Sequence, residues 1–354
     1  MKKILVIQNK RIGDVLIASV LANNLKKHFP ESLIHYFVYD YTAGVLEGNP
    51  NIDQIVTVQD RELKKLPVLW KTIQQVKREQ YDIILDPYAK FQSRMLCYFS
   101  QASIRVGFKR QNKKLRLSYY THEVEFLNEG HMPCGKALED RMHMLTSAFG
   151  IKDPDPMYRI FLSEEEKNYS RIAHLERPVV MIGILGSTRN KSLPFRYTAE
   201  LIDFIAENYQ ATLLFNYAPN QKAEAKEIYD LCQCKEQVHW DIYEDSIRGF
   251  IKLMNQCELL ISNEGGSVHI AKALQKPTFT IYSPFISKSH WNSFEDGKTH
   301  DSVHLFDKNP EGFNQLSREE KKAIEKNPEI LYNQLTPTLI KEKLIPYLDY
   351  HLKS

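Results

Sequence analysis

The chain has 354 residues, of which 43% are hydrophobic and 26% are charged, with 47 basic and 44 acidic side chains. This composition excludes a fibrous or disordered protein, and the length suits two domains of ordinary size. The net charge of +3 is too small for the field of the whole protein to hold nucleic acid. We therefore expect no nucleic-acid partner, and any basic site must be local.

Cysteine usage and hydropathy bear on the compartment. The five cysteines are scattered, and the one close pair, Cys232 and Cys234, lacks the spacing of a tetrahedral zinc site. The apolar run at residues 4–7 is too short for a signal peptide, and no run reaches the ~20 residues that span a bilayer. We predict a cytoplasmic protein with reduced thiols and no bound metal.

In chain order, the first half alternates strands with helices. Short β-rich runs and helical periodicities predict strands at 3–7, 32–40, 52–59 and 81–88, and helices at 15–25, 68–80 and 138–151. Such alternation is typical of a doubly wound, mostly parallel α/β sheet, because parallel strands need a crossover and the helix supplies it.

A proline-rich connection follows, and then the alternation starts again. Prolines at 154, 156 and 178 flank a charged helix and indicate a link between two lobes. We predict a first Rossmann-like domain over 1–158 and a second over 159–334. In the second domain the pattern predicts strands at 178–186, 211–218, 259–263 and 277–284, and helices at 194–209, 221–233, 246–258 and 266–275.

The last segment, 335–354, is an amphipathic helix with Pro346 inside it. A proline in a helix interior removes a hydrogen bond and kinks or interrupts the helix. The apolar face of this helix needs a partner surface, and we expect it to pack back on the first domain.

Ligands of open α/β sheets bind at the carboxyl ends of the strands, so function is sought in the strand-to-helix loops. Three of these loops carry polar or charged side chains: 9–14 ("NKRIGD"), 186–194 ("GSTRNKSLP") and 262–269 ("SNEGGSVH"). In the last of them Gly265 and Gly266 let backbone N–H groups at a helix start approach an anion such as a phosphate. The alternative is a plain tight turn with Ser267 capping the helix. No GxGxxG fingerprint of a dinucleotide site is present.

The other two loops also allow two interpretations. Lys191, with hydroxyls and Arg189 nearby, can act as a point charge for a phosphate, or the loop can be a solvated basic turn. Asp14 follows Gly13 at the start of a helix, where a carboxylate is stabilised by the helix dipole whether or not it is catalytic.

Taken together, the three loops resemble a known family. The opening "KILVIQNKRIGDVLIASVLANNL", the stretch "GSTRNKSLPFRYTAELID" and the stretch "LLISNEGGSVHIAKALQKPTFTIYSP" are similar to glycosyltransferase family 9, the lipopolysaccharide heptosyltransferases, over roughly residues 1–290. The resemblance implies a GT-B fold, in which two Rossmann-like domains face a central cleft. It also implies an inverting, metal-independent transfer of a heptose-like sugar from a nucleoside diphosphate donor to a lipopolysaccharide or related glycan acceptor, with no cofactor.

The resemblance also implies roles for individual residues. Asp14 matches the catalytic aspartate, which acts as general base on the acceptor hydroxyl, and Lys191 matches the lysine that neutralises the leaving diphosphate. Glu264 stands where the family usually has aspartate, and Gly265 where it often has serine or threonine. The implied donor-binding set is Gly186, Ser187, Thr188, Arg189, Lys191, Glu264, Gly265, Gly266, Ser267 and His269.

For the acceptor, the stretch 105–124 is strongly basic and has little apolar periodicity. It suits an acceptor with phosphates or acidic sugars, or an anionic membrane surface, and a solvated loop is the alternative. We thus expect peripheral contact with the inner face of the cytoplasmic membrane. The acceptor-binding set is Lys10, Arg11, Gly13, Arg105, Lys109 and Arg110.

Three functions are weighed against one another: an active heptosyltransferase-type enzyme, a non-catalytic or differently specialised relative that only binds a nucleotide sugar or glycan, and an unrelated oxidoreductase. The missing dinucleotide fingerprint disfavours the last. Neither the nucleotide base, the sugar, the acceptor linkage nor the oligomeric state can be predicted from these residues.

Overall fold

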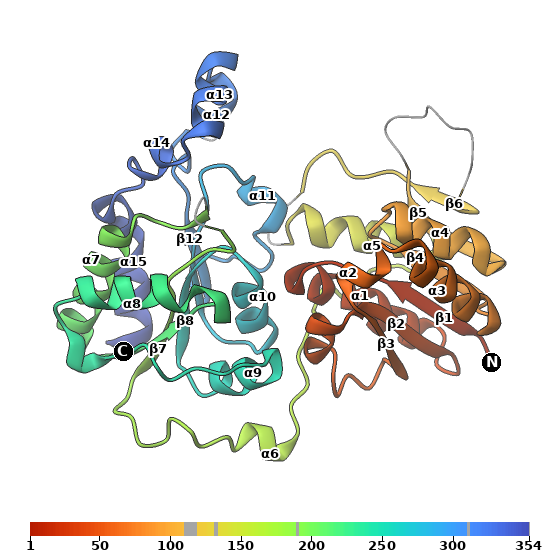
Figure 1. The fold of residues 1–354 in the computed structure, drawn as a ribbon, viewed down its shortest axis with the longest axis horizontal. Helices are drawn as coiled ribbons and strands as arrows, with labels where there is room; N and C mark the ends of the chain where they lie inside the picture. The colour runs from red at the N-terminus through yellow and green to blue at the C-terminus, as the bar shows by residue number, and fades with distance from the viewer. Residues whose placement is uncertain (110–118, 131–133, 189–190, 310–311, 354) are drawn as a thin grey trace. The chain divides into compact units, whose positions relative to one another are not determined.

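A computed structural model of the chain describes residues 1–354 except 110–118, 131–133, 189–190, 310–311 and 354. The chain divides into two compact units, one comprising Met1–Phe161 and Ser289–Ser293, the other Leu162–Lys288 and Phe294–Ser354 (Figure 1). Each unit is built around its own six-stranded parallel sheet, as the alternation of strands and helices predicts.

The first unit holds the strands in the order β3-β2-β1-β4-β5-β6. All five pairings are parallel, so each connection is a crossover. The chain starts in the middle and winds outward in both directions, which places the reversal of strand order between β1 and β4. The strands are β1 (Lys3–Ile7), β2 (Leu33–Tyr39), β3 (Gln54–Val58), β4 (Ile83–Asp86), β5 (Ile104–Phe108) and β6 (His122–Val124).

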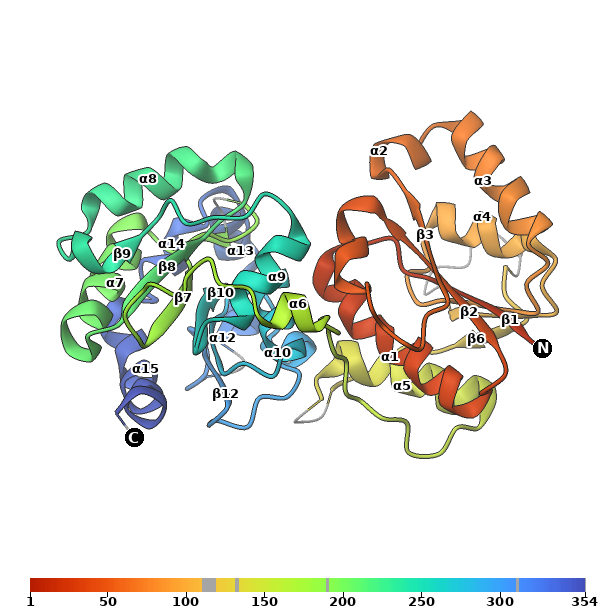
Figure 2. The same cartoon turned by 90° about the horizontal axis from the view of Figure 1, so that it is seen from below.

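Helices cover both faces of this sheet (Figure 2). Helices α1 and α5 lie together on one face, and α3 and α4 lie together on the other. Burial on both sides explains why β1 reads as a continuous apolar run. The helices are α1 (Ile12–His28), α2 (Asp60–Leu63), α3 (Leu66–Arg78), α4 (Phe91–Ser100) and α5 (Lys136–Phe149), with a 3-10 turn η1 at Asp40–Val45.

The second unit repeats this topology, with strand order β12-β11-β10-β7-β8-β9 and parallel pairings throughout. Its reversal of strand order lies between β7 and β10. The strands are β7 (Val179–Gly183), β8 (Thr212–Asn216), β9 (Val238–His239), β10 (Leu259–Asn263), β11 (Thr278–Ile281) and β12 (His300–Val303).

Alternate residues of these strands enter two separate apolar cores. Val180 and Ile182 of β7 pack with α7, α8 and α15, whereas Val179 and Met181 pack with α9 and α10. The longer helices of this unit are α7 (Phe195–Tyr209), α8 (Lys222–Leu231), α9 (Ile247–Asn255), α10 (Gly266–Ala273), α13 (Arg318–Lys326) and α15 (Pro337–Leu352). The short elements are α6 (Glu164–Lys167), η3 (Pro219–Gln221), η4 (Lys235–Gln237), α11 (Lys288–Trp291), α12 (Gly312–Gln315) and α14 (Glu329–Tyr332).

The C-terminal helix packs into the core of the second unit, whereas we expected its apolar face to cover the first. Ile340, Leu344 and Leu348 of α15 are fully buried in the core of the second unit, against α7 and the sheet. The Tyr209 hydroxyl on α7 also donates to Asp349, at 2.8 Å. Helix α15 thus covers this face of the second sheet together with α7 and α8. The helix continues through Pro346 as one element.

Sequence patterns missed the far edge of the first sheet. The basic stretch 105–124 contains β5 and β6, and α4 precedes them. Gly107 sits within β5 because a Cβ there would lie 2.2 Å from the Tyr120 ring. That ring packs over the strand, and its hydroxyl donates to the buried Asp86 at 2.7 Å. The sequence pattern did not reveal β5 because the strand contains a glycine and a charged residue, which local strand propensity disfavours. Gly107 is required there by its contact with the Tyr120 ring.

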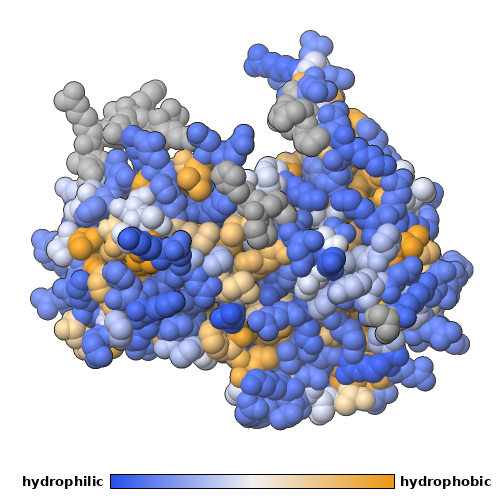
Figure 3. Space-filling view, turned by 180° about the vertical axis from the view of Figure 1, so that it is seen from behind, coloured by the Kyte–Doolittle hydropathy of each residue, from blue (hydrophilic) through white to orange (hydrophobic). Residues whose placement is uncertain are grey.

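No helix in the described part of the chain has the length and apolar character needed to cross a bilayer. On the face drawn in Figure 3, hydrophobic side chains form small patches within a largely hydrophilic surface. The five cysteines are free thiols, and Cys97, Cys232 and Cys257 are buried.

Candidate active site

The carboxyl edge of the second sheet is the first part of the candidate site. Strands β7 and β10 are neighbours at the reversal of strand order, and their loops leave in opposite directions along the sheet. Such a point leaves a crevice where open α/β sheets bind ligands. The loop at 184–194 and the turn at Glu264–Gly265 both start here, so the topology brings two of the three predicted loops together.

The loop after β7 is closed by its own backbone. A Cβ on Gly186 would lie 2.1 Å from the carbonyl oxygen of Lys191, so only glycine fits there. The Gly186 N–H donates to Ser192 Oγ at 2.9 Å, and this hydroxyl donates to the Thr188 carbonyl at 3.1 Å. Ser192 therefore locks the loop, a role that its sequence position does not reveal. Ser187 and Thr188 are exposed at its tip.

Lys191 lies at the base of this loop, facing the turn after β10. Its Nζ is 3.5 Å from Oε1 of Glu264, while Oε2 of Glu264 accepts the Ser283 N–H at 2.9 Å. The Glu264 side chain is only 10% exposed, whereas that of Lys191 is 35% exposed. Burial raises the pKa of Glu264, and the Ser283 N–H and the Lys191 charge oppose that shift. Among the described residues, the ammonium thus has Glu264 as its carboxylate partner and keeps an exposed side.

The glycine turn lies next to this ion pair. Gly265 is exposed, and a Cβ there would meet no protein atom within 4 Å. Helix α10 begins at Gly266, and Ser267 Oγ is 3.2 Å from Ser262 Oγ. Because the N-cap residue Gly265 has no side chain, it supplies no capping group to the N–H groups of the first turn. The first N–H groups of a helix lack intrahelical partners, so this end offers donors and a partial positive charge to an anion.

His269, one turn into α10, is buried. Burial lowers its pKa to about 3, with a further contribution from the charge of Lys272. The ring is therefore neutral at physiological pH, and it can contribute hydrogen bonding or packing but not positive charge.

The first unit contributes the third loop, again after a central strand. Asp14 is the third residue of α1, is 6% exposed, and accepts a hydrogen bond from Lys10 Nζ through Oδ1 at 2.7 Å. Arg11 is the N-cap residue and is exposed, and Gly13 is buried within the first turn. Oδ2 of Asp14 accepts no hydrogen bond from a described residue, which leaves an acceptor for a substrate proton.

A cationic group beside Asp14 was not found from the sequence. Arg141 on α5 is 7% exposed, and its Nε has no hydrogen-bond partner in the described part of the chain. Burial lowers the pKa of Arg141, and the charges of Asp14 and Asp140 oppose the shift. Only tertiary packing of α1 against α5 could reveal this pairing.

The returning segment Ser289–Ser293 completes this region of the first unit. The Lys10 ammonium lies 5.8 Å from the centre of the Trp291 ring, and the Tyr158 hydroxyl is 2.9 Å from Ser293 Oγ. Burial lowers the pKa of His290, and the charges of Lys136 and Arg141 lower it further. Residues nearly 300 positions after β1 thus line the surroundings of Asp14.

The structure does not bring all of the predicted acceptor-binding residues together near Asp14. Arg105 pairs in register with Ile84, which pairs with Leu5, so it lies below the carboxyl edge. Its guanidinium donates to the carbonyls of Ala102 and Tyr119. Lys109 is exposed and paired with Glu125. Arg110 and Arg189 lie outside the described residues.

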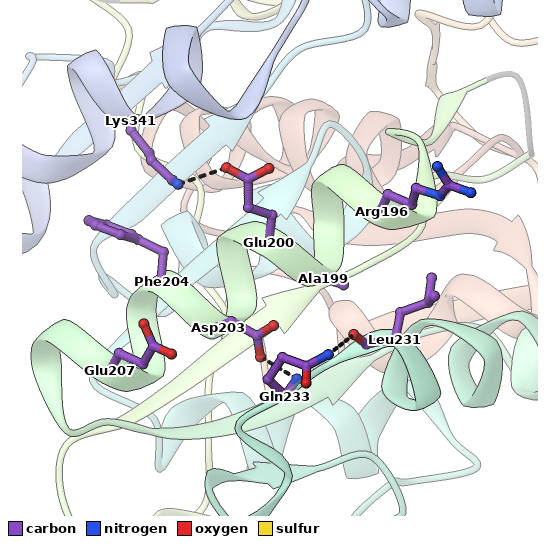
Figure 4. A pocket seen from close by; sticks show the side chains of 9 residues that line it. All are labelled: Arg196, Ala199, Glu200, Asp203, Phe204, Glu207, Leu231, Gln233 and Lys341. Carbon is purple, nitrogen blue, oxygen red and sulfur yellow. Dashed lines mark hydrogen bonds and ion pairs between the residues drawn. The ribbon is translucent and has the colours of Figure 1, made fainter.

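Among the described residues, neither a metal site nor the surface hollow of the second unit competes with this site. The described His, Cys, Asp and Glu residues include no group of three or more placed to hold a metal ion. A hollow of about 470 Å³ lies on the outer helices of the second unit (Figure 4). Its Glu200 is paired with Lys341, and its Asp203 accepts two backbone N–H groups, so two of its carboxylates already have partners within the protein. Its lining residues are Arg196, Ala199, Glu200, Asp203, Phe204, Glu207, Leu231, Gln233 and Lys341.

Comparison with known proteins identifies the family of this chain. Residues 69–316 match the model of glycosyltransferase family 9 (heptosyltransferase), which is well over half of the chain. This chain belongs to glycosyltransferase family 9. The matched range contains the loop after β7 and the turn after β10 but begins after Asp14, so a role for Asp14 must be argued from its own surroundings.

The following relatives of this family 9 enzyme match most of its length at low identity. It is 23% identical to the lipopolysaccharide heptosyltransferase 1 of Campylobacter coli over 309 residues, 83% of this chain and 86% of the relative. A family 9 glycosyltransferase from Veillonella parvula superimposes with a TM-score of 0.75 at 16% identity and covers 100% and 98% of the two chains. The Escherichia coli ADP-heptose lipopolysaccharide heptosyltransferase II gives 0.71 at 18% identity, with 98% of each chain covered. These likenesses confirm the predicted two-domain GT-B fold.

The site of this glycosyltransferase offers groups that suit transfer from a nucleotide. Breaking a bond to a diphosphate builds negative charge on the departing phosphate oxygens, and preorganised donors at that position lower the barrier. The Lys191 ammonium and the free N–H groups at the start of α10 are donors of this kind. Asp14 in the first unit is a buried carboxylate with an available oxygen, which suits a general base.

Proposed function

We propose that this enzyme transfers a heptose-like sugar from ADP-heptose, or a similar nucleoside diphosphate sugar, to a lipopolysaccharide core acceptor. The Campylobacter coli and Escherichia coli relatives named above are lipopolysaccharide heptosyltransferases, and the second is named for ADP-heptose. The single observation that carries the proposal is the pairing of Lys191 with the open glycine turn before α10, at the strand reversal of the second sheet.

In this proposal the second unit binds the donor. The diphosphate takes the N–H groups of Gly266 and Ser267 and the Lys191 ammonium, and Gly265 leaves room for its oxygens. Glu264 keeps Lys191 oriented while leaving its exposed side open to the phosphate. Oε1 of this buried carboxylate, which faces the Lys191 ammonium at 3.5 Å, can also accept a hydrogen bond from a sugar hydroxyl.

The first unit supplies the base and receives the acceptor. Asp14 Oδ2 takes the proton of the acceptor hydroxyl as that oxygen attacks the anomeric carbon, and the bond to the diphosphate breaks in the same step. A single displacement of this kind inverts the anomeric configuration. Lys10 orients the carboxylate, and the Arg141 guanidinium, whose Nε has no hydrogen-bond partner among the described residues, binds an anionic group of the acceptor.

Neutralisation of the leaving diphosphate by Lys191 and backbone N–H groups makes a metal ion unnecessary in this scheme. We further propose that the enzyme works at the inner face of the cytoplasmic membrane, in peripheral contact with lipid, because a lipopolysaccharide acceptor is anchored there.

The test is release of ADP from ADP-heptose in the presence of acceptor, with and without EDTA. We expect the wild type to be active in both and Asp14→Asn, which keeps the shape but not the basicity, to be inactive. Equal ADP release by the Asn variant would remove Asp14 from the mechanism. A thermal-shift comparison of ADP, UDP, GDP and CDP tests the donor separately, since a ligand of the native state raises Tm.

A further inference from the structure

Helices α3 and α4 of the first unit expose large apolar side chains on their outer surface. Leu66 is 74% exposed and Trp70 56% exposed on α3, while Phe91 is 58%, Tyr98 42% and Phe99 38% exposed on α4. The opposite sides of the same helices, including Leu69, Ile73 and Leu96, are buried against the sheet. The exposed residues are therefore a second apolar set, beyond the one that the fold uses.

We call these exposed side chains the aromatic face: Leu66, Trp70, Phe91, Tyr98 and Phe99. The Trp70 and Phe99 rings are 6.1 Å apart between centroids, which joins α3 to α4, and the Tyr98 and Phe99 rings are 5.2 Å apart. Phe91 and Tyr98 are seven residues apart and so share one side of α4. Scattered exposed apolar residues need no explanation, but a connected aromatic group marks an interaction site.

Charge is distributed unevenly around the aromatic face. Helices α3 and α4 contain four cationic residues, Lys71, Lys77, Arg78 and Arg94, and no acidic residue. The acids that flank α3 are neutralised by other lysines: Asp60 by Lys64, Glu62 by Lys65, and Glu79 by Lys3. No described carboxylate pairs with Lys71, Lys77 or Arg78, which are all exposed.

We infer that the aromatic face and its lysines form the surface by which the enzyme attaches peripherally to an anionic lipid bilayer. Trp and Tyr prefer the boundary between headgroups and acyl chains, and Lys and Arg beside them are attracted to anionic headgroups. Both features occur together on the two helices, and neither is required by the core. This inference rests on the proposed function, because it locates the membrane contact that a lipid-anchored acceptor requires.

Charge complementarity selects a membrane rather than a second copy of the chain. A second copy docking through the same face would oppose two sets of unpaired cations, with no acidic residue on either α3 or α4 to compensate them. An anionic bilayer instead neutralises these cations and takes up the aromatic rings.

The experiment is co-sedimentation of the purified full-length chain with vesicles of phosphatidylcholine alone and of phosphatidylcholine with phosphatidylglycerol. We expect binding to the anionic vesicles that weakens as salt is raised. Two variants separate the contributions: Trp70→Ser with Phe99→Ser removes the central rings, and Lys71→Gln with Lys77→Gln removes two charges. Tyr350→Ser on α15, where the tyrosine is 59% exposed in the second unit, is the matched control.

Neutralising the two lysines should lower vesicle partitioning by roughly thirtyfold, which corresponds to about 1 kcal/mol per cation near an anionic surface. The ring variant should lose binding at least as strongly, and Tyr350→Ser should bind as the wild type does. All variants should keep the wild-type far-UV circular dichroism and Tm, since the replaced side chains are exposed.

Retention of binding by both double variants would overturn the inference. So would loss of a dimer in light scattering of the ring variant, because the face would then be a contact between copies. ADP release with a delipidated, soluble acceptor should be unchanged in the double variants. If the wild type binds anionic vesicles but releases no ADP, the transfer proposal fails and the membrane surface remains.

Discussion

Replacement of Lys191 by glutamine separates a catalytic role from a structural one. The ammonium lies 3.5 Å from Glu264 Oε1, and Coulomb's law at an effective dielectric constant of about 20 gives an attraction of about 5 kcal/mol at that distance. Because the Lys191 side chain is 35% exposed, solvent screening reduces the net contribution to stability to about 1 kcal/mol. Since domains are stable by ~5–15 kcal/mol, nearly all of the Lys191→Gln enzyme should remain folded.

The effect on transfer should be much larger. Loss of one preorganised donor at the position of developing charge typically costs about 3 kcal/mol, or roughly a hundredfold or more in kcat. We therefore expect kcat to fall by at least about a hundredfold in Lys191→Gln. Lys191→Arg keeps the charge and should recover part of the rate, with a residual loss because the planar guanidinium places its donors differently.

The assay is ADP release at saturating donor and acceptor, together with urea unfolding of each variant. Glu264→Gln and the double variant complete a mutant cycle, in which the stability losses should be less than additive because the two side chains contact each other. A kcat for Lys191→Gln within a few-fold of the wild type would refute the leaving-group role. The same conclusion would follow if activity losses across the cycle merely tracked losses of stability.

Three further predictions address the loops, the acceptor side and acid stability. Gly186→Ala should weaken ADP binding and lower Tm, because the added Cβ would lie 2.1 Å from a backbone carbonyl oxygen. Gly265→Ala should weaken ADP binding in calorimetry without changing Tm, because its Cβ would meet no described protein atom and would occupy the space proposed for the phosphate. Arg141→Met should raise KM for the acceptor, because the cation that binds its anionic group is lost. Urea stability should stay equal or rise, since the buried Nε that lacks a hydrogen-bond partner among the described residues is replaced by apolar atoms in a side chain of similar length. An unchanged KM would remove Arg141 from the acceptor site. The two hydrogen bonds from Arg248 lower the pKa of Glu166 to about 2. The stabilisation from this pair is therefore present above the unfolded pKa of about 4.5 and is lost as the pH falls toward 2. The slope of stability against pH should be smaller in Glu166→Gln over that window, and an identical slope would contradict the assignment.

Local pattern was sufficient for the central strands and for the loops that follow them. The run at β1 and the strand at β10 are buried on both faces, so their apolar sequences identify them without knowledge of their neighbours. The glycine turn at Gly265 and Gly266 also stands out locally. Parallel winding then implies that loops after central strands meet at one edge, which is how Lys191 and Glu264 came to be assigned to one site.

Long-range packing decided the rest. Arg141 looks like an ordinary helical arginine in the sequence, and its importance comes from α5 packing against α1, which buries the guanidinium beside Asp14. The return of residues 289–293 to the first unit has no local signal, because contacts such as Tyr158 with Ser293 join positions 135 residues apart.

The sequence by itself determined the two α/β units, their central strands and the family, because burial on both faces and glycine turns leave recognisable patterns in short stretches of chain. The tertiary structure alone decided which core takes the C-terminal helix, where the β5 strand runs and which cation accompanies Asp14. An amphipathic helix has an apolar face but carries no information about its partner, so α15 could be assigned only from its contacts in the core of the second unit.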